Sequence, residues 1–212
     1  MPPGMFALTT LARVKAGLVN LDNTPEEDLE LERLIDSVTS LFEAATGRRL
    51  KSRTYRPSGA GPGEELLVLS GSRRLSPCAF HVPEWPLTDV SAITILPASL
   101  DLAQALVLVA GEDWTFTARG TITLIDGDLV EWGENNLQVT FTAGYLATHA
   151  LWPSLEQACA DQVRYQFKKL TNPQDLVTSL SDPGGSVTYF QGPLLPQVRM
   201  LLENTFRRRD LL

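Results

Sequence analysis

One junction in the second half of the chain constrains the fold more than any other feature. Residues 137–142 alternate apolar and polar side chains, as a half-buried strand does, and this run stops at Gly144 and Tyr145. A long amphipathic helix is expected directly afterwards, because apolar side chains then recur at helical spacing. These are Leu155, Cys159, Val163, Phe167 and Leu170. The chain therefore passes from a β-rich region into a helical one at this point.

An earlier junction runs in the opposite direction, from helix to strand. Thr24 suits the N-cap of a helix, Pro25 its first position and Glu27 the reciprocal place of a capping box. Apolar residues follow at helical spacing as far as Ala45, and Gly47 suits the C-cap. We therefore expect a helix that ends near Gly47, with strands after it.

The region between these junctions is rich in short β-type runs separated by turn residues. Asp126-Gly127 is a two-residue hairpin signal within it, while residues 100–109 fit either a short helix or a strand. Regular spacing of strands and turns is typical of a small antiparallel sandwich or barrel. The expected strands cover residues 52–56, 66–69, 90–95, 114–117, 121–125, 129–132 and 137–142.

The fold class that follows is α+β, a helical bundle with an inserted antiparallel β sandwich or barrel-like domain. The bundle combines N-terminal helices with two C-terminal helices. Residues 1–50 are its N-terminal part, residues 51–146 the β-rich insert, and residues 147–212 the C-terminal helices, loop and basic tail that complete it.

Local signals sharpen the helical parts. Thr9 or Thr10 can cap a short helix that runs through Leu18, and Ser154 with Gln157 resembles a second capping box. Residues 171–192 are rich in turn formers and are expected to be a loop that is mobile or becomes ordered on a partner, and Pro196 starts a last helix. That helix should turn Val198, Leu201, Leu202 and Phe206 inward, while the polar face of the preceding helix carries Gln157, Asp161, Arg164 and Lys168.

Composition excludes several classes of protein. Hydrophobic residues make up 43% and charged residues 20% of the 212 residues, as in ordinary globular proteins, and the longest apolar stretches are too short to cross a membrane. Residues 61–150 hold three Lys/Arg against eleven Asp/Glu, a net charge of −8, which repels a phosphate backbone. No signal peptide is recognised at the start.

Residues able to carry catalysis or bind a metal are scarce. The histidines are His81 and His149, and Cys78 with His81 forms half of a zinc site without a second half. The acidic pairs Glu112/Asp113 and Asp126/Asp128 fall in turns, where acids also favour solvent. We expect no enzyme, no metal and no cofactor; a metal-dependent hydrolase built on Cys78, His81 and the turn carboxylates is the weakest hypothesis.

Two features suit contacts with other proteins. The arginines at 48–49 and 207–209 close helices, where cations complement the helix dipole, and the latter are equally well placed to dock in an acidic groove or to touch DNA. Tyr189-Phe190, in the loop before the last helix, either pack under that loop or enter a neighbouring subunit, and we favour the second.

The order and spacing of several motifs resemble those of the phage head–tail connector family, also called adaptor or head-completion proteins. The resemblance covers most of the chain. It rests on residues 8–15, Ala45–Leu50, Ser52–Tyr55, Trp85–Val90, Val139–Tyr145, Pro153 with the helix after it, and Ser186–Tyr189 before the last helix. The β region, roughly residues 66–132, is longer than in compact members of that family.

The resemblance implies a non-enzymatic homo-oligomeric ring of about twelve copies in the neck of the virion. Such a ring is expected to lie beneath the portal protein and above a stopper or tail-terminator protein. Double-stranded DNA would pass through its lumen without sequence-specific binding, and no membrane is involved. The protein would be made in the cytoplasm of the bacterial host. Candidate portal or subunit contacts are Tyr189, Phe190, Phe206, Arg207, Arg208 and Arg209, and candidate ring-helix residues are Arg48, Arg49, Arg164 and Lys168.

A binding module is the alternative hypothesis. A β-sandwich flanked by helices could bind a carbohydrate or another ligand if the insert exposed an aromatic platform. Trp114 and Trp132 are the residues that such a platform would use.

Overall fold

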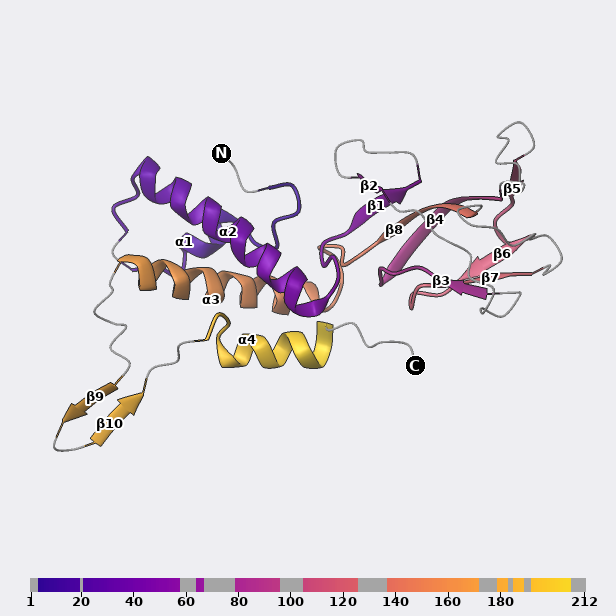
Figure 1. The fold of residues 1–212 in the computed structure, drawn as a ribbon. Coiled ribbons are helices and arrows are strands. Elements are labelled where there is room, and N and C mark those ends of the chain that lie inside the picture. The colour runs from indigo at the N-terminus through magenta and orange to yellow at the C-terminus, as the bar shows by residue number, and fades with distance from the viewer. Residues whose placement is uncertain are drawn as a thin grey trace. The chain divides into compact units, whose positions relative to one another are not determined.

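The structure is a computed structural model that describes residues 4–19, 21–57, 64–66, 79–95, 105–125, 137–171, 179–182, 185–188 and 192–206. It confirms the α+β class, with helices near both ends of the chain and sheets between them (Figure 1). The chain divides into two compact units. The helical unit comprises Met1–Leu50 and Ala147–Leu212, and the β unit comprises Lys51–Leu146.

The helical unit is built around two long helices, α2 (Pro25–Thr46) and α3 (Trp152–Thr171), which pack against each other. The short helix α1 (Leu11–Lys15) contacts both, and α4 (Pro196–Leu201), continued by the π-helical turn η4 (Leu202–Phe206), contacts α3 and α2 (Figure 1). The core is formed by the apolar stripes of these elements. Its most buried side chains include Leu8, Val14, Leu31, Ile35, Phe42, Leu155, Val163, Leu202 and Phe206.

The boundaries of α2 are those that the local signals predict. The Thr24 hydroxyl accepts a hydrogen bond from the Glu27 amide at 3.3 Å, and the Glu27 carboxylate accepts one from the Thr24 amide at 3.3 Å. Gly47 ends the helix with φ of 69°, a left-handed conformation that glycine adopts without steric cost. The capping box and the C-cap are therefore confirmed.

The expected boundaries of the other early and late helices need correction. The first helix starts after Thr10, whose hydroxyl accepts from the Arg13 amide, but it ends at Lys15 and not at Leu18. The capping box at Ser154 and Gln157 is wrong, because α3 already begins at Trp152. The Trp152 amide donates to the His149 carbonyl at 2.9 Å, which places Ser154 inside the first turn.

A second correction concerns residues 171–192, which were expected to be a loop. Two antiparallel strands form there, β9 (Ser179–Asp182) and β10 (Gly185–Thr188). Leu180 and Val187 are the only apolar side chains in these eight residues, so the sequence lacks the apolar alternation by which a strand is recognised.

In the described part of the β unit the strands form two sheets. The larger has the strand order β2-β1-β8-β4-β5 and the smaller the order β3-β7-β6. The larger sheet uses β1 (Arg53–Arg56), β2 (Glu64–Leu66), β4 (Leu87–Ile95), β5 (Leu106–Leu108) and β8 (Leu137–Ala143). The smaller uses β3 (Ala79–His81), β6 (Trp114–Phe116) and β7 (Thr121–Leu124).

Pairing in both sheets is antiparallel with one exception, since β1 and β2 are parallel. The expected strand at 66–69 overlaps β2 at Leu66, and residues 67–69 lie outside the described residues. Within residues 100–109, the described part contains the strand β5 and no helix. The predicted strand at 129–132 and its Asp126-Gly127 turn lie outside the described residues.

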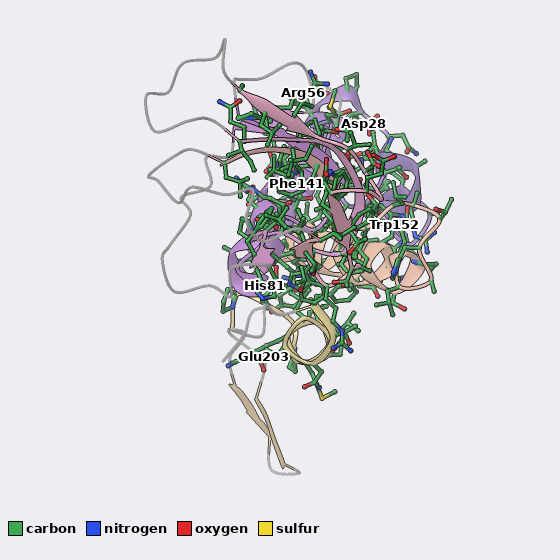
Figure 2. All side chains as sticks on the ribbon, turned by 90° about the vertical axis from the view of Figure 1, so that its right-hand side faces the viewer. Asp28, Arg56, His81, Phe141, Trp152 and Glu203 are labelled. Atoms are coloured by element: carbon green, nitrogen blue, oxygen red, sulfur yellow. The ribbon has the colours of Figure 1, made fainter. Side chains whose placement is uncertain are left out.

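The core of the β unit follows the two-residue period of its strands. On β8, Leu137, Val139, Phe141 and Ala143 are buried, while the residues between them are half-buried. The Phe141 ring, labelled in Figure 2, stacks on the Tyr55 ring with centroids 4.8 Å apart and planes inclined by 15°.

Gly144 explains why β8 ends where it does. Its φ is 106°, and a Cβ atom there would lie 2.7 Å from the Lys51 carbonyl oxygen. The backbone at 51–52 thus runs directly against this glycine, and the Ser52 amide donates to the Tyr145 carbonyl at 3.1 Å. Only glycine combines this conformation with so close an approach of the backbone.

Candidate assembly surfaces of the helical unit

Among the described residues, no three His, Cys, Asp or Glu side chains gather as metal ligands would. His81, on β3 (Figure 2), hydrogen bonds through Nδ1 with the Thr121 hydroxyl at 3.0 Å, and Cys78 lies outside the described residues. His149 Nδ1 accepts a hydrogen bond from the Leu151 amide at 3.1 Å. Both histidines therefore have local structural contacts. No helix in the described part of the chain is long and apolar enough to cross a membrane.

The end of α2 holds the first pair of predicted ring-helix residues. Arg48 is buried, and its Nε donates to the Phe206 carbonyl at 2.6 Å. This carbonyl belongs to the last residue of η4, and the C-terminus of a helix carries partial negative charge. Arg48 therefore joins the end of α2 to the end of the last helix, and Phe206 itself is a fully buried core residue.

Arg49 has a different environment, because its side chain is nearly half exposed. Its Nη1 donates to Glu43 Oε2 at 2.8 Å, while Glu43 Oε1 accepts from the Leu50 amide at 3.2 Å. The Glu43 side chain is only 6% exposed, so one buried carboxylate fixes the turn after α2 and presents Arg49 at the surface. Arg49 is thus the arginine of this pair that a partner can reach.

The helical pattern places Arg164 on the polar face of α3, but in the structure its side chain is largely buried. Its side chain is 16% exposed and reaches from α3 to the end of α1. Nε donates to the Val14 carbonyl at 3.0 Å, Nη2 donates to the Arg13 carbonyl, and Nη1 donates to Asp161 at 2.9 Å. Arg164 therefore caps the C-terminus of α1 and anchors α1 to α3.

Three further side chains extend this contact between α1 and α3. The Arg13 guanidinium approaches Glu156 at 3.3 Å and donates to the Gln157 amide oxygen at 3.2 Å. The Gln157 amide nitrogen donates to Asp161 at 2.8 Å. We call Arg13, Glu156, Gln157, Asp161 and Arg164 the α1–α3 polar cluster. Lys168, one turn beyond Arg164, is exposed and stands outside this cluster.

The helical unit also contains a groove of about 490 Å³. Its floor is apolar, and the Arg199–Glu203 ion pair at 2.8 Å lies along it on the last helix; Glu203 is labelled in Figure 2. The lining residues are Ala45, Gly192, Pro193, Leu194, Arg199, Leu202 and Glu203.

The wall of this groove is fixed by a glutamine that sequence reasoning passed over. Gln162 is fully buried on α3; its amide nitrogen donates to the Pro193 carbonyl at 3.1 Å, and its amide oxygen accepts from the Leu195 amide at 2.8 Å. A polar residue on the buried side of an amphipathic helix was the available signal. Gln162 therefore positions the segment that leads into α4.

The remaining predicted contact residues, Tyr189, Phe190, Arg207, Arg208 and Arg209, lie outside the described residues. The residue that precedes each of these two groups is described. Tyr189 directly follows β10, and Arg207 directly follows η4. Their contacts with a portal protein or a second subunit stay a prediction.

The aromatic platform of a carbohydrate-binding module is not present at Trp114. Its side chain is 3% exposed and belongs to the core of the β unit, so it has no face on which a sugar ring could stack. Trp132 lies outside the described residues.

The comparisons with known proteins agree with the fold. The family model described as "Head completion protein" matches residues 7–208. A solved structure described as the neck of an empty GTA particle, computed with C6 symmetry, is similar to the chain with a TM-score of 0.59 and 18% sequence identity. The match covers 100% of this chain and 95% of that one. No curated protein sequence matches.

Proposed function

The chain belongs to the head completion protein family, and on that premise we propose that it forms a closed ring beneath the portal, through which the genome passes between capsid and tail. The observation that carries this proposal is the extent of the family match, which spans both the helical and the β unit. Head completion is a structural role in the virion. The chain is thus proposed to be a component of the particle and not an enzyme.

The similar solved structure supports the ring. That chain comes from a particle neck computed with C6 symmetry, and its fold matches along the whole length of this chain. Rings of identical subunits need two different surfaces on each copy, so that the contact is heterologous and closes. By the family resemblance we propose about twelve copies.

The charges of the chain are compatible with a lumen that lets DNA pass without binding it tightly. The β unit contains six Lys/Arg and eleven Asp/Glu, and the helical unit twelve Lys/Arg and fourteen Asp/Glu. Neither unit has the excess of basic residues from which sequence-independent DNA binding draws its affinity. We propose that the acidic side chains of the ring repel the DNA phosphates, so that DNA moves through the lumen without being held by cationic side chains.

Arg49, Lys168, Tyr189, Phe190 and Arg207–Arg209 are proposed to contact the portal or a neighbouring subunit. Arg49 and Lys168 are reachable from outside the helical unit, as described above. Arg48, Arg164 and Phe206 would act on such contacts indirectly, because they hold the helical elements in place.

The test is reconstitution with tail-less capsids of the same particle that carry the portal and lack this protein. We expect the purified chain to bind them and to produce a ring below the portal in electron micrographs, and to restore joining of tails. Absence of binding to portal-bearing capsids, together with a monomeric chain in analytical ultracentrifugation, would sink the proposal.

A further inference from the structure

The hairpin of β9 and β10 has no further strand beside it among the described elements. Its register pairs Asp182 with Gly185 and Leu180 with Val187, and two residues in sequence, Pro183 and Gly184, connect the strands. The structure thus contains a separate two-stranded ribbon of four residues per strand.

Such a ribbon has little to stabilise it alone. An isolated two-stranded hairpin is marginally stable at best in water, and three strands or packing on another element are needed for stability. Leu180 and Val187 are the single apolar cross-strand pair of this one, and the other paired residues are Ser, Thr, Asp and Gly. An additional strand beside the ribbon would therefore stabilise it.

Both outer edges of the ribbon can accept a strand. In an antiparallel ladder, paired residues alternate between those that bond to each other and those whose N–H and C=O point outward. A two-residue connection makes Asp182 and Gly185 a bonded pair, so the Ser181 and Ser186 amides point to opposite outer edges. These strands hold no lysine, no proline and no bulge, the devices that protect sheet edges from pairing.

We propose that the ribbon of each copy pairs with the ribbons of its two neighbours, which makes a continuous antiparallel sheet around the ring. This inference rests on the proposed function, since it needs a ring of identical subunits. The β9 edge of one copy would meet the β10 edge of the next. Because these two edges differ, the contact is heterologous, which gives a ring rather than a two-fold dimer when the rotation between neighbouring copies closes.

A second copy fits this edge better than a strongly charged partner does. The two strands carry a single charged residue, Asp182, so ribbons placed side by side bring few like charges together. Ribbons that share one orientation also alternate in strand direction, β9, β10, β9, β10, and every new pairing is then antiparallel.

Two proline variants test the two edges separately. Ser181→Pro removes the outward amide of the β9 edge, and Ser186→Pro removes that of the β10 edge. Neither removes an amide of the ribbon's own ladder, and proline is tolerated where the missing N–H faces outward. Ser181→Ala and Ser186→Ala keep both amides and serve as matched controls.

Ring closure is measured by sedimentation velocity and electron microscopy of the full chain, alone and on portal-bearing capsids. Wild type and both alanine variants are expected to form rings, and each proline variant alone is not. An equimolar mixture of the two proline variants keeps one usable β9–β10 junction per pair. It should therefore give dimers joined at the ribbon but no closed rings. Two misfolded variants could not form such dimers.

Amide hydrogen exchange supplies an independent measurement. We expect residues 179–188 to exchange quickly in the free chain and slowly in the wild-type ring. Proline variants that close rings like the wild type, or ribbon amides that exchange equally fast in ring and monomer, overturn the pairing while the proposed function stands. Loss of rings in Ser181→Pro alone overturns the head-to-tail arrangement. A wild-type chain that forms no ring in either setting overturns the proposed function and the pairing together.

Discussion

At Gly17, the missing side chain leaves the space that the Arg164 guanidinium occupies. A Cβ atom on Gly17 would lie 2.2 Å from Arg164 Cζ, far inside van der Waals contact. The guanidinium cannot simply move aside, because it donates to the Val14 and Arg13 carbonyls and to Asp161. Gly17 and Arg164 are therefore coupled, although 147 positions separate them in sequence.

This coupling predicts a non-additive double mutant. Gly17→Ala should lower the free energy of unfolding by about 1–3 kcal/mol through overpacking, and Arg164→Ala by about 1.5–3 kcal/mol through loss of charged hydrogen bonds. In the Arg164→Ala background, Gly17→Ala should cost almost nothing, since the clash is gone. Urea denaturation of the four proteins measures the cycle, and Lys168→Ala is the matched exposed control, expected within about 0.5 kcal/mol of wild type. Additive losses would contradict the coupling.

Cys159 provides a second residue-scale prediction. It lies in the core of the helical unit, and burial raises the pKa of its thiol to about 12, against a partial opposing effect of the hydrogen bond with Thr39. The thiolate is the reactive form, so the folded protein should resist alkylation. In a Cys78→Ser protein, we expect iodoacetamide to label nothing at pH 8.5 until urea unfolds the chain. Rapid labelling of the folded protein would show that Cys159 is accessible.

The same pKa fixes the sign of a pH dependence. The folded thiol holds its proton to about pH 12, whereas the unfolded thiol loses it near its ordinary value of 9.0. The unfolded state therefore binds fewer protons between these values, and the contribution of Cys159 to stability is complete below pH 9 and falls as the pH rises toward 12. In urea titrations at pH 8, 9 and 10, the free energy of unfolding of Cys159→Ala should therefore fall less with rising pH than that of wild type.

At the scale of elements, Gln162 decides how the last helix joins the bundle. Both polar atoms of its buried amide bond to the backbone just before α4. Gln162→Leu keeps the size of the side chain but leaves the Leu195 amide and the Pro193 carbonyl without this partner. Each buried unsatisfied group costs about 1–3 kcal/mol.

We therefore expect Gln162→Leu to lower the free energy of unfolding by about 2–6 kcal/mol and to increase amide exchange in residues 192–206. Gln166→Leu, one turn further along α3 at a half-buried position, is the control and should leave that exchange unchanged. Unaltered exchange in α4 of the Gln162→Leu protein would mean that apolar packing alone holds this helix.

The elements that could be predicted from the sequence are those whose signals are local. The ends of α2 depend on Thr24, Glu27 and Gly47, which act within one turn of the helix, so the pattern and the structure agree there. The same rule misplaced the start of α3, because a Ser-x-x-Gln spacing also occurs inside a helix. There Gln157 bonds to Arg13, a residue 144 positions away that no local pattern reveals.

Long-range pairing accounts for the remaining differences. The parallel partnership of β1 and β2 depends on how a connection of several residues is routed, and the inward turn of Arg164 depends on where α1 docks. The β9–β10 ribbon escaped prediction because its residues have low strand propensity and gain their order from pairing. The candidate contact residues are predicted from their charge or aromaticity and their position in the chain, which do not distinguish a buried Arg48 from an exposed Arg49.

For the whole molecule, the end of the last helix determines how the C-terminal arginines can be tested. Phe206 is fully buried, and its carbonyl accepts from Arg48. A deletion that begins at Glu203 would therefore remove a core aromatic along with the tail. Removal of a buried phenylalanine side chain costs about 3–5 kcal/mol of stability. If that variant failed to assemble, the cause could be loss of the fold and not loss of the arginines.

Deletion of residues 207–212 separates the two effects. The variant keeps Phe206 and its contact with Arg48, so its urea midpoint should stay close to that of wild type, whereas deletion of 203–212 should lower it strongly. We expect the shorter deletion to bind portal-bearing capsids at least tenfold more weakly, because three arginines are lost from the proposed contact. A full-length protein with Arg207→Gln, Arg208→Gln and Arg209→Gln isolates charge from length, and wild-type binding should weaken as salt rises. If both tail variants bound capsids with wild-type affinity in co-sedimentation, the arginines would not belong to the interface. Their remaining role would be to complement the dipole of the last helix.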